Sequence, residues 1–126
     1  MQEAIGNKSG VALVYGNLAS LYLTLSDSST GFKAKQYLTS AIKYGMDAYK
    51  ISQEINSTAA INRSSQKLFR AHKAIGNYKE AVFFADQYIN TKDSMFNLEK
   101  TNSIAEAEKK FETEKKQLQI EKLNKE

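Results

Sequence analysis

The sequence contains no proline at any of its 126 positions. Proline interrupts helices more firmly than any other residue, because its ring fixes φ and its nitrogen has no hydrogen to donate. A chain of this length with average composition would contain about six prolines. Glycine is also scarce, with six residues. We therefore expect an all-α chain whose helices run without internal interruption.

Apolar residues recur at the i, i+3, i+4 spacing of a helix along most of the chain. The predicted helices cover about 11–25, 32–55, 58–75, 78–89 and 92–126. Residues 26–31 (SDSSTG) form a loop by composition. Residues 1–10 are expected to be the end of a preceding helix followed by a turn, because Gly6, Asn7 and Gly10 disfavour a helix.

Short motifs mark the ends of the later helices. The Asn56-Ser57-Thr58 motif ends the second predicted helix and supplies an N-cap for the third. The Gly76-Asn77 pair supplies a C-cap and a turn. Residues 91–94 (TKDS) offer a further N-cap, so we expect the last helix to begin there as a separate element.

The chain carries little catalytic equipment. It has no cysteine and a single histidine, His72. These counts exclude a disulfide framework, a thiolate metal site and a histidine-rich metal site, and they argue against a catalytic triad. We therefore predict a protein that is not an enzyme, with no catalytic residues, no metal site and no cofactor.

Positive charge is concentrated in the middle of the chain. The formal net charge is +4, from 18 Lys and Arg against 14 Asp and Glu. Residues 32–79 hold nine basic and two acidic residues, whereas residues 99–126 hold seven of each. Residues 9–26 carry no charge over 18 positions, but they include Ser, Gly, Asn and Thr, and a membrane span needs about 20 predominantly apolar residues. We expect a helix buried between protein neighbours and no membrane segment.

Two stretches of the chain resemble each other and the tetratricopeptide repeat. The pattern LFxxHxxxGxYxxA over residues 68–81 is similar to the helix-pair signature of that family, and residues 18–22 match its first helix. The resemblance implies two antiparallel helical hairpins over 11–91, stacked as a solenoid, and a charged helix over 92–126 that caps them and then extends or forms a weak coiled coil. It implies packing roles for Leu18, Ala19, Tyr22, Ala41, Ala48, Leu68, Phe69, His72, Gly76, Tyr78 and Ala81.

The C-terminal part of the chain resembles one class of proteins that contain this repeat. The segments 76–81 (GNYKEA) and 92–97 (KDSMFN), followed by a Glu/Lys-rich helix, are similar to the sensor region of bacterial membrane-anchored signalling proteins. In those proteins the repeats precede a histidine kinase or a LuxR-type helix-turn-helix regulator. The resemblance implies the sensory fragment of a longer signal-transduction protein, which binds a protein or peptide.

The resemblance also implies a ligand groove lined by the first helix of each repeat. An i, i+4 pair of cations with an amide donor suits a carboxylate or an acidic peptide. Asn17, Arg63 and Lys67 fall where chaperone-binding members hold a peptide carboxylate. From the residues alone, a solvated basic helix face is favoured over an anion-binding groove. A nucleic-acid site is favoured least, because the net charge is only +4 and no helix-turn-helix element is evident. The implied groove residues are Leu13, Asn17, Ser20, Thr24, Arg63, Gln66, Lys67, Arg70 and Lys73.

A scaffold or dimerisation module without a ligand is the second hypothesis. The apolar residues of 11–25 are one candidate surface for self-association. The C-terminal helix is the other, because Ile104, Phe111 and Leu118 repeat every seven residues. Only half of that coiled-coil seam is apolar, since the companion positions include Glu114 and Glu121.

Overall fold

Four α-helices make up the structure, a computed structural model that describes the backbone of residues 2–125 and the side chains of residues 6–124. They are α1 (Gln2–Asp27), α2 (Gly31–Glu54), α3 (Thr58–Ile75) and α4 (Tyr78–Lys125). No strand occurs between residues 2 and 125, so the all-α prediction is confirmed. The chain divides into two compact units, Met1–Asp93 and Ser94–Glu126, which are described separately.

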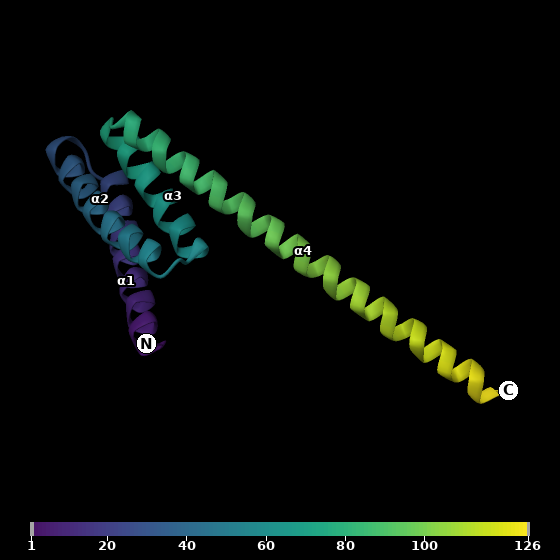
Figure 1. Ribbon diagram of the computed structural model, residues 1–126. Coiled ribbons are helices and arrows are strands. Elements are labelled where there is room, and N and C mark those ends of the chain that lie inside the picture. Colours follow the sequence, from purple (N-terminus) through teal and green to yellow (C-terminus); the bar gives the residue numbers. More distant parts are fainter. Residues whose placement is uncertain (1, 126) are drawn as a thin grey trace. The chain divides into compact units, whose positions relative to one another are not determined.

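In the first unit, α1, α2 and α3 lie side by side (Figure 1). Helices α1 and α2 run antiparallel, since Lys8 near the start of α1 pairs with Glu54 at the end of α2 at 3.2 Å. Helix α3 packs against both. The first core cluster joins these three helices through Leu23, Leu38, Ala41 and Ala71.

A second core cluster attaches the first turns of α4. Phe84 of α4 meets the Tyr49 ring of α2 edge-on at 5.3 Å and stacks on His72 of α3 at 5.6 Å. Leu68 completes the cluster and has no exposed surface. Residues 78–93 of α4 therefore form the second half of a hairpin with α3.

The capping prediction for α3 is confirmed at both ends. The Ser57 hydroxyl accepts a hydrogen bond from the Ala60 N–H at 3.2 Å and caps the first turn. Gly76 has φ +94°, a left-handed conformation that glycine adopts without steric cost. Its N–H donates to the Lys73 carbonyl at 3.2 Å, and the Asn77 N–H donates to the His72 carbonyl at 2.8 Å.

The turn predicted at Gly6, Asn7 and Gly10 does not form, because α1 continues through all three residues. A glycine in a helix costs about 1 kcal/mol relative to alanine, which weakens a helix without ending it. The Lys8–Glu54 ion pair also connects this segment to the end of α2. The prediction that residues 1–10 contain a turn is therefore wrong for the residues that the structure describes.

The break predicted at residues 91–94 is also absent, so the expected helices 78–89 and 92–126 are the single helix α4, described as far as Lys125. The Thr91 hydroxyl donates to the Gln87 carbonyl at 2.7 Å and accepts a hydrogen bond from the Asn62 amide at 3.1 Å. A hydroxyl bonded inside its own helix does not cap a new one. Glu126 lies outside the described residues.

Helix α1 is not enclosed between neighbours as the uncharged segment 9–26 had suggested. Its buried residues are mostly small: Ala12, Gly16, Ala19 and Ser26, together with Leu23. Val14 and Leu21 are 56% and 51% exposed. The physical reason is that α2 and α3 both contact one face of α1, and small residues permit that close approach. Within residues 2–125, no helix combines the length and apolar character that a membrane crossing requires.

In the second unit, every side chain from residue 94 to residue 124 is exposed. Glu106 and Lys110, and likewise Glu112 and Lys116, stand at the i, i+4 spacing that supports a solvated helix. Ile104 is 50% exposed and Phe111 is 67% exposed. The capping and coiled-coil roles of this segment stay predictions.

Candidate functional site

Helix α3 carries the basic residues of the candidate site on successive turns. Arg63, Lys67 and Arg70 follow one another at i, i+4 and i+7, so they share one face of the helix. Lys67 is partly buried, whereas the two arginines are exposed. Because the Ser57 cap and the Gly76 cap fix both ends of α3, the register of this face is set by local sequence.

Lys67 is held against α1. A Cβ built on Gly16 would lie 3.0 Å from the Lys67 Nζ, so the ammonium occupies the space that any other residue at position 16 would fill. Burial lowers the pKa of Lys67 from its ordinary value, and the nearby Arg63 guanidinium lowers it further. Among residues 6–124 no carboxylate lies within ion-pair distance of this ammonium. Lys67 is thus a partly desolvated cation without a counter-charge.

A crevice of about 20 Å³ lies beneath the Lys67 side chain. That volume is enough for about one water molecule, because a water needs roughly 10–15 Å³ of this kind of space. A ligand larger than water must therefore bind outside the crevice, along the surface between α1 and α3. The lining comes from three helices: Ala12, Leu13, Gly16, Ala48, Ser52, Ala60, Arg63, Ser64 and Lys67.

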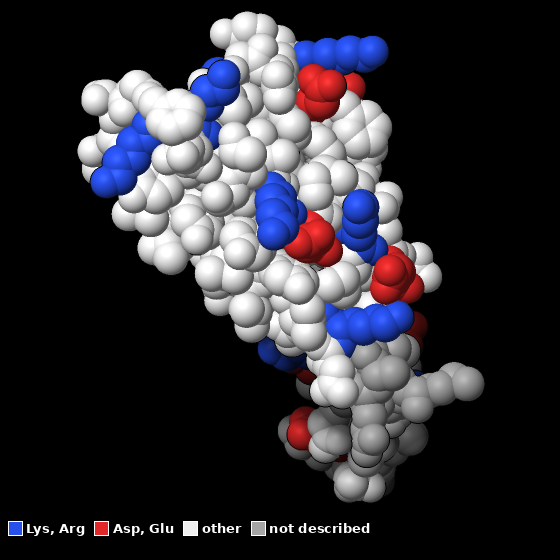
Figure 2. Space-filling view, turned by 90° about the vertical axis from the view of Figure 1, so that its left-hand side faces the viewer, with Lys and Arg blue, Asp and Glu red and all other residues white. Residues whose placement is uncertain are grey.

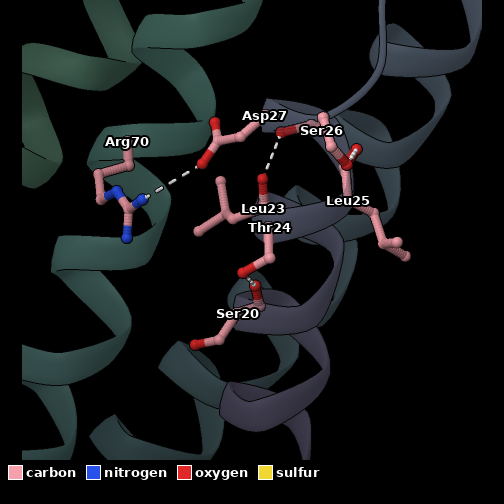
Figure 3. A network of polar contacts seen from close by, with 8 residues as sticks. Ser20, Leu23, Thr24, Leu25, Ser26, Asp27 and Arg70 are labelled. Carbon is pink, nitrogen blue, oxygen red and sulfur yellow. Dashed lines mark hydrogen bonds and ion pairs between the residues drawn. The ribbon is translucent and has the colours of Figure 1, made fainter.

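Arg70 is the cation of this face that has an acidic neighbour. Figure 3 shows its guanidinium reaching from α3 toward Asp27 at the end of α1, with Nη2 and Oδ2 separated by 4.0 Å. Both side chains are more than half exposed, so the pair contributes little to stability. The Ser26 hydroxyl donates to the Leu23 carbonyl at 2.6 Å and closes the last turn of α1 just before Asp27 (Figure 3).

The other predicted groove residues make no contact with Lys67 among the hydrogen bonds and ion pairs of the described residues. Lys73 lies 5.8 Å from the centroid of the Phe69 ring, a cation–π contact within α3. The Thr24 hydroxyl donates to the Ser20 carbonyl within α1. Asn17 and Gln66 are exposed and make no side-chain hydrogen bond within the part of the chain that the structure describes. The structure therefore brings together Leu13, Arg63 and Lys67, with Arg70 at the edge.

Sequence reasoning missed two residues of this site, Gly16 and Asp27. Gly16 admits the Lys67 ammonium, and Asp27 pairs with Arg70. The available signal for Gly16 was its place as a small residue inside an apolar helical pattern, which indicates a close approach of backbone and neighbour. No local signal connects Asp27 with a residue 43 positions away.

The packing residues implied by the repeat resemblance are mostly inside the fold. Tyr78 departs from this set, because its side chain is 68% exposed. Leu18, Tyr22 and Phe69 are partly buried. Gly76 forms the α3 C-cap. The buried members are Ala19, Ala41, Ala48, Leu68, His72 and Ala81.

His72 belongs to the core and not to the basic face. Its ring stacks on Phe84, and its Nδ1 lies 3.3 Å from the Asn77 amide nitrogen. Burial lowers the pKa of His72, and the negative charge of Glu80 partly offsets that effect. Across the described side chains, no group of three or more His, Asp or Glu residues is placed to hold a metal ion.

The α1–α3 face presents hydrogen-bond donors that carry positive charge. Lys67 and Arg63 offer charged donors, and Arg70 offers a third that is weakly held by Asp27. None of the protein-family models, curated proteins or solved structures compared with the chain matches it. Functional proposals therefore depend on the contacts, burial and charge of the chain's own residues.

Proposed function

We propose that the unit Met1–Asp93 is a non-catalytic helical module that binds a protein or peptide and recognises an acidic segment of it along α3 and α1. The observation that carries the proposal is the position of Lys67, a partly buried ammonium beside Arg63 that has no carboxylate of residues 6–124 within ion-pair distance. A desolvated cation without a partner is unfavourable, and a bound carboxylate restores the lost interactions.

The geometry favours an extended acidic segment over a compact ligand. The space beneath Lys67 holds about one water, so the recognised groups must lie along the surface. Three cations at i, i+4 and i+7 span roughly 10 Å at the 1.5 Å rise of an α-helix. Consecutive carboxylates of a peptide chain can reach all three.

A fluorescence anisotropy titration with a labelled hexaglutamate peptide tests this proposal. The variant Arg63→Glu/Lys67→Glu should weaken binding by at least about tenfold, since hydrogen bonds to charged groups contribute about 1.5–3 kcal/mol. The matched control is Lys43→Glu/Lys50→Glu, which changes the net charge equally at two exposed lysines of α2. Equal affinities of the two double variants would refute the site.

Two further probes distinguish acidic-peptide binding from unspecific peptide binding and from nucleic-acid binding. A hexaglutamine peptide should not bind, because it lacks the carboxylates that the cations recognise. A single-stranded oligonucleotide of similar charge should bind more weakly than hexaglutamate. If the oligonucleotide binds more tightly and depends on Arg63 and Lys67, the surface serves nucleic acid and the peptide proposal is wrong.

We attribute the module to the tetratricopeptide type, with α1–α2 and α3–α4 as two repeats. The support is the burial of Ala19, Ala41, Ala48 and Ala81 at positions where that repeat uses small residues. We further propose a sensory role in a bacterial signal-transduction protein, and its support is the sequence resemblance of residues 76–97. The coding sequence that adjoins this segment tests that role: a membrane span with a kinase or DNA-binding domain is expected, and a frame with neither would contradict it.

A further inference from the structure

The outer face of α1 carries a regular apolar seam that the fold covers only in part. Val11, Val14, Leu18, Leu21 and Leu25 follow one another at alternating spacings of three and four residues. This alternation is the heptad pattern through which one helix packs along another. Val11, Val14 and Leu21 are 43%, 56% and 51% exposed, and Leu18 and Leu25 are partly exposed.

This seam is distinct from the face of α1 that builds the core. Ala12, Ala19 and Leu23 point to α2 and α3 and are buried. None of the five seam residues belongs to either core cluster. Helix α1 therefore has two apolar faces, and the face with Ala12, Ala19 and Leu23 is the one that α2 and α3 cover.

The flanks of the seam carry no charge from residue 9 to residue 26. On one side stand Tyr15 and Tyr22, whose rings stack on Tyr44 of α2 at 6.0 and 5.7 Å and hold that flank rigid. On the other side stand Asn17 and Thr24. Flanking charges usually select the partner of such a seam, and here nothing repels an identical helix. Figure 2, which faces the left-hand side of Figure 1, shows a mostly uncharged surface with scattered basic and acidic side chains.

The two ends of the seam differ in the size of their side chains. Near the N-terminal end, Gly6, Asn7 and Gly10 border an open depression of about 550 Å³ that also includes Val14. Apart from the adjoining backbone of α1, no described atom lies within 4 Å of a Cβ built on Gly6 or Gly10. The other end carries the large side chains of Leu21 and Leu25. An antiparallel copy of α1 places its leucines over the glycines of the first copy, and the two-fold axis repeats the contact.

We propose that the α1 seam pairs two copies of this chain in an antiparallel, two-fold symmetric contact. The seam from residue 7 to residue 25 is about 27 Å long at 1.5 Å per residue, and a helix is about 10 Å wide. Its footprint is therefore roughly 300 Å² per copy, below the roughly 800 Å² per partner of a standard stable interface. The dimer is accordingly weak and reversible.

Sedimentation velocity over about 10 µM to 1 mM, the range in which small interfaces associate, tests the pairing. The wild type should pass from monomer to dimer across this series. Leu21→Glu should weaken association by at least about tenfold, because it places an unpaired charge in each half of the seam. The control is Ile104→Glu on α4, an apolar residue of equal exposure at 50%.

Two results of the sedimentation experiments would overturn the proposed pairing. A wild type that stays monomeric up to 1 mM overturns it, as does a dimer lost in Ile104→Glu and kept in Leu21→Glu. Leu21 touches neither core cluster, so its variant should keep the helical circular dichroism of the wild type. If it does not, Val14→Glu replaces it, at another exposed seam residue.

Cross-linking tests the orientation independently. The chain has no cysteine, so single cysteines report without background. A mixture of Gly10→Cys and Leu21→Cys should form a mixed disulfide under mild oxidation, since the antiparallel pairing sets residue 10 of one copy near residue 21 of the other. Preferential cross-linking of Leu21→Cys to itself would overturn the antiparallel arrangement.

Discussion

The substitution Gly45→Ala tests how closely α2 and α3 approach each other. Gly45 is buried in the middle of α2. A Cβ at this position would lie 2.9 Å from Leu68 Cδ2 and 3.1 Å from Leu68 Cγ, closer than carbon atoms normally pack. Leu68 has no exposed surface and is packed in a cluster with Tyr49 and Phe84, so it has little room to rotate away.

Two opposing contributions set the magnitude. Alanine is favoured over glycine in a helix by about 1 kcal/mol. Forcing an additional carbon into a packed core costs about 1–3 kcal/mol. We therefore expect Gly45→Ala to leave the free energy of unfolding unchanged or to lower it by up to about 2 kcal/mol. Gly10→Ala is the matched control, because no atom lies within 4 Å of its Cβ position, and it should raise stability by up to about 1 kcal/mol.

Urea denaturation followed by circular dichroism, at a protein concentration where the chain is monomeric, measures both variants. The difference between them isolates the steric contribution of Leu68, about 1–3 kcal/mol. For a unit of this size, 1 kcal/mol corresponds to a shift of about 4–8 °C in melting temperature. If Gly45→Ala stabilises the protein as much as Gly10→Ala does, Leu68 relaxes freely and the contact between α2 and α3 is not tight.

Further substitutions test single contacts of the same unit. Ser57→Ala should lower the free energy of unfolding by about 1 kcal/mol through loss of the α3 N-cap, as measured by urea denaturation. Ser65→Ala should leave stability unchanged or raise it, because the Ser65 hydroxyl is buried and makes no hydrogen bond within residues 6–124; a loss above about 1 kcal/mol would contradict this. Since burial lowers the pKa of His72 below 6.5, the unfolded chain binds a proton at a pH where the folded chain does not. Stability measured against pH should therefore fall as the pH drops from about 7 through the folded pKa, then level off, and His72→Gln should remove this fall. Gly16→Ala should displace the Lys67 ammonium into solvent and raise its pKa toward 10.5, which an NMR titration of the lysine side chains detects.

Helix α3 was predictable because its ends are defined by short-range chemistry. Ser57 caps the first turn through a hydrogen bond three residues ahead, and Gly76 supplies the positive φ that ends the last turn. Both signals are contained in a few consecutive residues. Tertiary contacts do not need to be known for such signals to be read.

The errors in α1 and α4 share one cause, which is that a weak local signal was interpreted as the end of a helix. Gly6 and Gly10 lower helix propensity, but nearby Lys8 pairs with Glu54 of α2. Thr91 has a capping side chain, but its hydroxyl bonds to its own helix and to Asn62 of α3. Each glycine costs the helix about 1 kcal/mol, which weakens α1 without ending it, and the exposed Lys8–Glu54 pair adds little to its stability.

Only part of the candidate site could be predicted from the sequence, because the burial of Lys67 depends on a residue that is distant in the chain. The basic face of α3 follows from helical spacing, and the sequence identified Arg63 and Lys67 as neighbours. The desolvation of Lys67 depends on Gly16, 51 residues away in the chain, and no local pattern contains that approach. The charge was therefore predicted, whereas the burial that distinguishes Lys67 from an ordinary surface lysine was not.

Helical periodicity identified α1 but did not show which of its faces the fold buries. The seam residues Val14 and Leu21 give the stronger apolar pattern, yet the fold buries Ala12 and Ala19 instead. A helix that contacts two neighbours on one side must come close to both, which favours small side chains there and leaves the large ones outside. Large apolar side chains at regular spacing on an exposed face are unfavourable in water unless another surface covers them. The exposure of Val14 and Leu21 is therefore the observation on which the proposed pairing of two copies rests, and these residues are distinct from Arg63 and Lys67, on which the proposed anion site rests.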